Sequence, residues 1–354
     1  MARRKLIWHI GLAQAPRPLI AANLEAHDQA LEAAGMQVAA SPNEARLATH
    51  ELLRTHRGAG LPRSEVEGRW ARICDRVWKH KGVSLLSTPD LSAADKDQIR
   101  LALDPLIGVE VHLVVTLDSF SQQIYGGWLA ELRTGRTTGW EKYVARVLAP
   151  TPEHRQAEQF WAGHDLPAVL GSWGWTFHAD RLHVVAEPDV AQHWLQFLDI
   201  AQAPDDDLVP VVPSYADPAG VAVLRKVNRQ LEEPLAASTA ELLTALDHEG
   251  AAMPVAPTSP LAPRVEEWTG ILISAGHDLR GDLSRLLDAG EGTALPGPRD
   301  QLTVAIDALA EALAENSRLR TETSALEADR DRLERKRRKL KRRLKRVRAA
   351  APAR

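Results

Sequence analysis

The sequence predicts an α/β fold in which a mostly parallel sheet is flanked by helices, followed by a long C-terminal helix. Strand and helix patterns alternate over the first 200 residues, as a parallel sheet requires. After residue 300 a heptad repeat of leucines replaces this alternation and predicts a separate helical unit. Four short apolar runs have the length of strands: 5–10, 83–86, 109–116 and 182–185.

The first predicted strand leads into a loop at the place where a nucleotide-binding protein holds phosphate. The strand Lys5-Leu6-Ile7-Trp8-His9-Ile10 precedes a helix predicted over 19–34. A strand, a tight loop and a helix N-terminus form an anion site, because free N–H groups and the helix dipole face the ligand. Such a loop needs glycines and a Lys or Arg. Gly11 is present, but Pro16 and Pro18 remove two N–H donors.

Helical periodicity predicts most of the remaining elements. Ser92-Ala-Ala-Asp95 is similar to a capping box, with Asp in place of the usual Glu or Gln. The other predicted helices cover 44–55, 63–80, 92–103, 122–132, 140–148, 155–164, 189–198, 221–231, 238–246 and 265–275. We expect an α/β domain over 1–290 with a flexible Pro-rich segment at 249–263, a linker at 291–300, a coiled-coil helix at 301–348 and disorder at 349–354.

Composition excludes several classes of protein. Hydrophobic residues make up 44% of the 354 residues, enough for a core. Cys74 is the only cysteine, so we expect neither an internal disulfide nor a cysteine-based metal site. No apolar run approaches the ~18 residues that span a bilayer, and the N-terminus lacks the pattern of a signal peptide. The expected location is cytoplasmic, with a peripheral membrane location as an alternative.

The charge is divided unevenly along the chain. The net charge is −3, but residues 335–354 carry 12 Lys and Arg and no Asp or Glu. The other 334 residues carry 32 basic and 47 acidic side chains, a balance of −15. A segment this basic predicts contact with an anionic polymer or a membrane surface, the alternative being a solvated tail that folds onto the acidic body. The polyanion-binding residues are Arg335, Lys336, Arg337, Arg338, Lys339, Lys341, Arg342, Arg343, Lys345, Arg346 and Arg348.

The C-terminal heptads predict a dimeric coiled coil. Position d holds Leu319, Leu326, Leu333, Leu340 and Val347. Asn316 occupies position a, where a buried Asn fixes the register of a parallel pair. Arg330 and Arg337 at later a positions weaken the C-terminal half. The alternative is a single solvated helix with ion pairs along its surface.

A series of short motifs, in order along the chain, resembles the sulfotransferase family, in particular a bacterial, largely actinobacterial branch. The resemblance covers about residues 5–290 and includes Ile7-Trp8-His9-Ile10-Gly11-Leu12, Val111-His112-Leu113-Val114-Val115-Thr116, Gln123-Ile124 with Trp128, Phe160-Trp161, Asp165-Leu166-Pro167 and Gly281-Asp282-Leu283. It implies a fold similar to P-loop kinases and transfer of a sulfuryl group from the donor PAPS to a hydroxyl or amine.

The chain departs from this family at three sites. In the loop that holds the donor's 5′-phosphosulfate, the family's Lys is replaced by Gln14 and its Gly by Pro16, with Arg17 nearby. Charge stabilisation is usually the largest catalytic effect in such reactions, so this loss matters most. At the site for the 3′-phosphate, Asp118 stands for the family's Arg and Gly126 for its Ser.

The third site is the general base. Thr88 and Pro89 occupy its positions, with Asp90 beside them as a substitute base or as a turn residue. We expect a protein that has lost PAPS binding and catalysis and serves in interaction or assembly as a dimer, with no cofactor and no metal.

Two alternatives stay open. One is an active sulfotransferase that uses PAPS with a rewired site, through Arg17 or Asp90. The other is a non-catalytic carbohydrate-binding protein, in which Trp173-Gly174-Trp175 with Phe177 is either a sugar platform or core packing.

Overall fold

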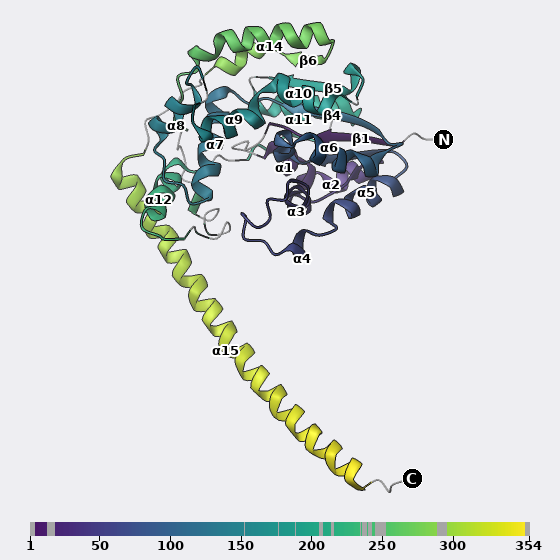
Figure 1. Ribbon diagram of the computed structural model, residues 1–354, viewed down its shortest axis with the longest axis vertical. Helices are drawn as coiled ribbons and strands as arrows, with labels where there is room; N and C mark the ends of the chain where they lie inside the picture. Colours follow the sequence, from purple (N-terminus) through teal and green to yellow (C-terminus); the bar gives the residue numbers. More distant parts are fainter. Residues whose placement is uncertain are drawn as a thin grey trace. The chain divides into compact units, whose positions relative to one another are not determined.

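The computed structural model describes residues 4–12, 18–151, 153–175, 177–187, 189–204, 208–213, 216–233, 235, 239, 243–244, 253–288 and 296–350. The chain divides into two compact units, Met1–Gln301 and Leu302–Arg354. The first unit is an α/β domain, and the described part of the second lies within one long helix (Figure 1). This confirms the prediction of an α/β fold with a parallel sheet and a long C-terminal helix.

A six-stranded, all-parallel sheet forms the centre of the first unit. Its order is β2-β3-β1-β4-β5-β6. The four predicted strands are present as β1 (Lys5–His9), β3 (Val83–Ser87), β4 (Glu110–Thr116) and β5 (Leu182–Ala186). The edge strands β2 (Gln37–Val38) and β6 (Asp278–Gly281) were not predicted. The central strand β1 pairs with β3 on one side and β4 on the other, so its loop opens in the middle of the sheet edge.

Three predicted helices are interrupted. The helix expected over 19–34 divides at His27 into α1 (Leu19–Ala26) and α2 (Asp28–Ala33). The helix over 63–80 divides into α4 (Arg63–Val66) and α5 (Arg69–Lys79), because Gly68 takes a left-handed conformation with φ 76°.

The third interruption corrects the predicted capping box. The segment 92–103 consists of the 3-10 helix η1 (Pro89–Ala93) and α6 (Lys96–Leu103). Asp95 is the N-cap of α6, and its partner is Gln98, not Ser92. The Asp95 carboxylate accepts a hydrogen bond from the Gln98 backbone N–H, and the Gln98 side-chain oxygen accepts one from the Asp95 backbone N–H.

Most of the remaining predicted helices are present with nearly the predicted bounds. The helix α10 was not predicted. Most of the segment predicted at 238–246 lies outside the described residues. Their bounds are α3 (Pro42–Leu53), η2 (Asp104–Leu106), α7 (Phe120–Arg133), α8 (Trp140–Val147), α9 (Arg155–His164), α10 (Leu166–Gly174), η3 (Ala179–Arg181), α11 (Val190–Ala201), α12 (Pro218–Asn228), η4 (Ser259–Leu261), α14 (Ala262–Ala275) and η5 (Leu283–Leu287).

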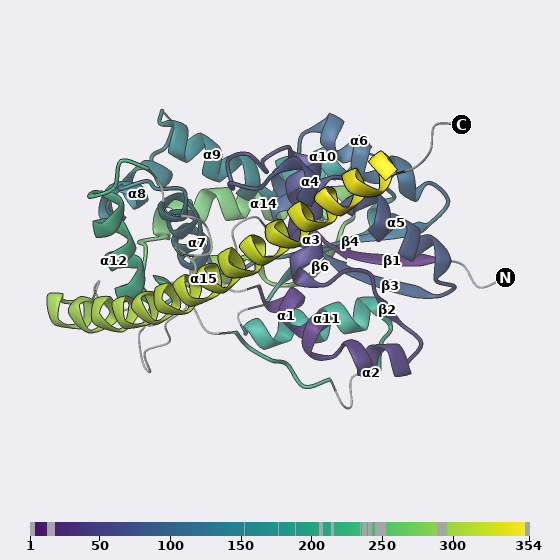
Figure 2. The same cartoon turned by 90° about the horizontal axis from the view of Figure 1, so that it is seen from below.

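The two faces of the sheet differ in polarity. One face contributes Leu6, Trp8, Leu113 and Val184 to a large apolar core that also takes side chains from α5, α7 and α10. The other face is covered by α1, α2 and α11 (Figure 2). On this second face the apolar residues occupy the middle of the strands, and polar side chains lie at both ends. The polar side chains at the strand ends are therefore the candidates for a functional site on this face.

The described part of the second unit, residues 302–350, lies within α15 (Pro298–Ala350), a continuous helix of 53 residues. It begins three residues before the predicted start at 301. Among the described residues, no helix is both long and apolar enough to cross a membrane.

Candidate functional site

The carboxyl end of β1 is where the sequence predicts a loop in the position of a phosphate-binding loop. Gly11 follows the strand with φ +49°, and a Cβ there would lie 2.9 Å from the Cβ of Pro89. Only glycine therefore fits, because both the backbone conformation and the contact exclude a side chain. Gln14 and Arg17 lie outside the described residues. The described start of the loop packs tightly against the turn after β3.

His9, the last residue of β1, is held between the two neighbouring strands. Its Nδ1 lies 2.8 Å from the Ser87 Oγ of β3, and its Nε2 lies 3.0 Å from the Thr116 Oγ1 of β4. The side chain is buried. Burial, with the nearby His193, lowers the pKa of His9 to about 3. The imidazole is therefore neutral near pH 7 and supplies no positive charge to an anionic donor.

The residues in the position of the general base lie in different surroundings. Thr88 is buried, and its Oγ1 accepts a hydrogen bond of 2.7 Å from the Trp8 indole N–H. Asp90 is exposed in the first turn of η1. Thr88 therefore belongs to the core, and Asp90 is the carboxylate of this turn that meets solvent.

The two positions that the resemblance matches to the donor's 3′-phosphate also lie in different surroundings. Asp118 follows β4, and its carboxylate lies 3.9 Å from the Nδ1 of buried His193 on α11. His193 donates its Nε2–H to the Glu187 carbonyl at 3.1 Å. Gly126 is buried within α7. The structure thus places a carboxylate, and no side chain at Gly126, where this resemblance expects an Arg and a Ser.

The carboxyl edge of the sheet carries only negative charge in its described part. At the first three positions after each of the six strands, every charged residue that the structure describes is acidic: Asp90, Asp118, Glu187, Asp189 and Asp282. Nucleotides and sulfate esters are anions, which these carboxylates disfavour at the positions that they occupy.

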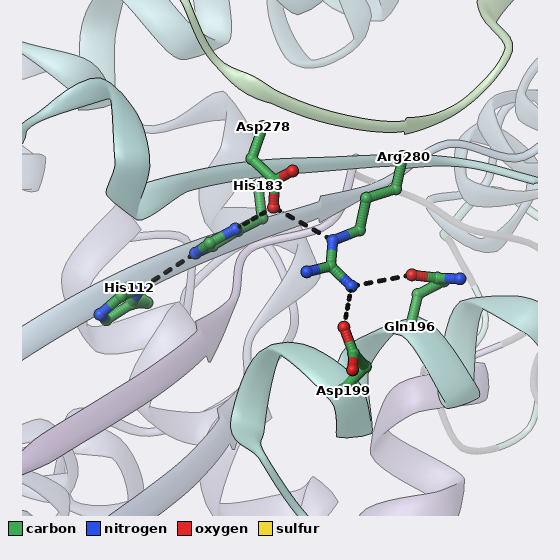
Figure 3. A network of polar contacts seen from close by, with 6 residues as sticks. All are labelled: His112, His183, Gln196, Asp199, Asp278 and Arg280. Atoms are coloured by element: carbon green, nitrogen blue, oxygen red, sulfur yellow. Dashed lines mark hydrogen bonds and ion pairs between the residues drawn. The ribbon is translucent and has the colours of Figure 1, made fainter.

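The opposite, amino end of the same sheet face holds a second polar cluster, shown in Figure 3. His112 of β4 and His183 of β5 stack, with 3.0 Å between His112 Nδ1 and His183 Nε2. His112 Nε2 lies 3.1 Å from the Glu110 carboxylate, and His183 Nδ1 lies 2.7 Å from that of Asp278 on β6. Sequence reasoning did not find this chain of contacts, which links three strands.

Arg280 ties this cluster to a helix. Its Nε donates to Asp278 at 3.1 Å, and its Nη1 donates to Gln196 at 2.9 Å and to Asp199 at 2.5 Å, both on α11 (Figure 3). Burial lowers the pKa of His183, although its bond to Asp278 opposes the shift. The contacts of Asp278 and Arg280 hold β6 against β5 and α11.

Of the three aromatic side chains named at 173–177, Trp173 and Phe177 pack in or against the core. Trp173 is fully buried, and its indole N–H donates to the Leu91 carbonyl at 3.2 Å. Phe177 packs against the large core, and Trp175 alone of the three is exposed. The interpretation as core packing is confirmed for Trp173 and Phe177.

The long helix α15 exposes a row of large apolar side chains. Leu319, Leu326, Leu333 and Leu340 are 47–65% exposed, at the predicted d positions. Among the described side chains of this helix, the other exposed large apolar residues are Leu302, Ile306, Leu309 and Leu313. Val347, the last predicted d residue, lies outside the described side chains.

This row refines the predicted frame in the first half of the helix. The d positions there would be Ala305 and Ala312, but the exposed large residues are Ile306 and Leu313. The heptad frame of the exposed apolar row before Asn316 is therefore offset by three residues from the frame after it. In a coiled coil, such a break in the heptad repeat locally changes the winding.

The basic end of α15 is exposed where the structure describes it. Arg335, Lys336, Arg337, Arg338 and Lys341 all face solvent. The side chains of the other predicted polyanion-binding residues, Lys339, Arg342, Arg343, Lys345, Arg346 and Arg348, lie outside the described part of the chain.

No protein-family model, no curated protein and no solved structure matches this chain significantly. Within the described residues, no group of three or more His, Cys, Asp or Glu side chains is arranged to hold a metal ion.

Proposed function

We propose that the protein is a sulfotransferase-like domain that no longer binds PAPS and acts as a non-catalytic assembly protein, dimerised through α15. The exposed leucine row of α15 is the observation that carries this proposal. An isolated helix of this length gains little from exposing eight large apolar side chains, whereas a second copy buries them. Asn316 at position a favours a parallel pair in one register.

The resemblance to sulfotransferases is supported by the fold alone. The sheet is parallel, with β1 in its middle, and its loop follows at the carboxyl edge. This is the place where parallel α/β folds bind ligands.

Loss of the donor is supported by charge. A donor with a 5′-phosphosulfate and a 3′-phosphate carries several negative charges. It would meet a neutral His9 and the carboxylate of Asp118 at this edge. Like charges at such a site cost binding free energy in addition to the contacts that are missing.

Calorimetric titration of the full chain with PAPS, and separately with its desulfated product, tests the loss of the donor site. We expect neither nucleotide to bind in the micromolar range, because the described edge is acidic. Micromolar binding would instead favour the alternative of an active sulfotransferase with a rewired site, in which Arg17 or Asp90 takes part.

The same proposal includes a polyanion contact through the basic end of α15. Counterion release makes such binding steeply salt-dependent. Replacing exposed Lys336, Arg338 and Lys341 by Gln, none of which lies on the a or d seam, is expected to lower the salt concentration that elutes the protein from immobilised heparin. Elution at the unchanged salt concentration would mean that the solvated-tail alternative is correct.

A further inference from the structure

A pocket of about 480 Å³ lies among the end of α7, α8 and the start of α9, and its lining residues all come from 135–159. No residue of the carboxyl edge or of the histidine cluster lines it. A second pocket of about 260 Å³ shares Arg136, Gln156 and Gln159 with it, so the two form neighbouring parts of one recess. The volume is in the range of small-molecule sites.

The wall of the recess is organised around Gln156. Its side-chain oxygen accepts from Arg146, and its amide nitrogen donates to Glu131 and, at 3.0 Å, to Thr138 Oγ1. Both ends of the Gln156 amide are therefore occupied, and Arg146 is held in a defined position. A binding surface that is ordered before the ligand arrives loses less entropy when the ligand binds.

The recess has an excess of positive charge. Arg136, Arg146 and Arg155 line it, against the single carboxylate of Glu131 in the adjoining part. The guanidinium groups of Arg136 and Arg155 make no hydrogen bond with any residue that the structure describes, although Arg136 lies near enough to the Glu131 carboxylate to attract it. Two guanidinium groups without a hydrogen-bond partner beside a fixed third one are suited to an anionic group with several oxygens.

The other lining side chains indicate the rest of the ligand. Thr137, Thr138 and Gln159 bring hydroxyl and amide groups to the recess, and no Phe, Tyr or Trp side chain lines its larger part, which His154 also lines. Hydroxyls and amides recognise hydroxylated molecules, and arginine recognises phosphate or sulfate oxygens. We propose that this recess binds a sugar that carries a phosphate or sulfate ester, with the ester on the arginines and the ring hydroxyls on the threonines and Gln159.

Calorimetric titration of the full chain with glucose 6-phosphate, glucose 6-sulfate and glucose tests this proposal. We expect saturable binding of at least one ester, and binding of unesterified glucose at least tenfold weaker. Whichever ester binds more tightly identifies the preferred anion and supports the proposal. No saturable heat with either ester would overturn it.

Variants locate the binding. The double variant Arg136→Gln, Arg155→Gln is expected to weaken ester binding at least tenfold. The control Arg72→Gln, Arg100→Gln removes two exposed arginines from α5 and α6 and should change it less than twofold. Thermal melts check that each variant is folded, and Arg155→Gln alone replaces the double variant if that one is not. The basic end of α15 is intact in all variants, so ester binding that survives in the pocket variant would place it elsewhere and contradict the proposal.

Discussion

Replacing Leu319 and Leu326 by Gln is expected to convert the protein from a dimer to a monomer. Both side chains are largely exposed in the single chain and lie at successive d positions of α15. A leucine that becomes fully buried contributes about 1.5–3 kcal/mol, and four such side chains are lost from each dimer. We expect the dissociation constant to rise at least about a thousandfold, which light scattering over a range of protein concentrations measures.

The control for this change lies on the same helix. Ser317 and Ser324 are exposed, are also seven residues apart, and lie one position after the a sites. Replacing both by Gln introduces the same residue without touching the seam and should leave the dimer intact. Dissociation by the serine pair, or survival of the dimer after the leucine pair is changed, would show that the leucine row does not form the interface.

The second large effect concerns pH and stability. Because the pKa of His9 falls from 6.5 to about 3 on folding, the unfolded chain binds a proton that the folded chain does not. The contribution of His9 is therefore complete above pH 6.5 and is lost as the pH falls toward 3. Between pH 7.5 and 4.5 this amounts to about 3 kcal/mol of unfolding free energy. Urea unfolding at the two pH values measures it.

Two variants separate His9 from other acid-sensitive groups. His9→Asn removes the titrating group. Between pH 7.5 and 4.5 this variant should therefore lose less unfolding free energy than the unchanged protein does, and the difference should be most of the ~3 kcal/mol attributed to His9. His154→Asn makes the same replacement at an exposed histidine at the start of α9 and serves as the matched control. Equal acid sensitivity in the unchanged protein and the His9 variant would show that His9 is not held in its neutral form.

The sequence predicts the strands that lie inside the sheet better than those at its edges. Four apolar runs correspond to β1, β3, β4 and β5, because strands covered on both faces need such runs. Strand β6 was missed because Asp278 and Arg280 make it polar, and their partners on β5 and α11 become visible only in the fold. The break at Gly68 had a local signal, whereas the break at His27 has neither Gly nor Pro to mark it.

The candidate site was predictable in position but not in its contacts. The sequence placed Gly11 after the first strand and Asp118 after the central strand. The contacts of His9 with Ser87 and Thr116 depend on the register of three strands that are far apart in the sequence. The same holds for the pair His112 and His183. The sequence of one strand does not reveal its register against a parallel neighbour. These contacts could therefore be found only in the structure.

The molar mass of the unmodified full chain in solution tests the central claim most directly. One chain has a mass of 38.9 kDa. Sedimentation equilibrium at micromolar concentration is expected to give about twice this value, because the leucine row of α15 is buried only when two helices pair. A mass of one chain throughout the micromolar range would contradict the proposed assembly and leave α15 as a solvated single helix.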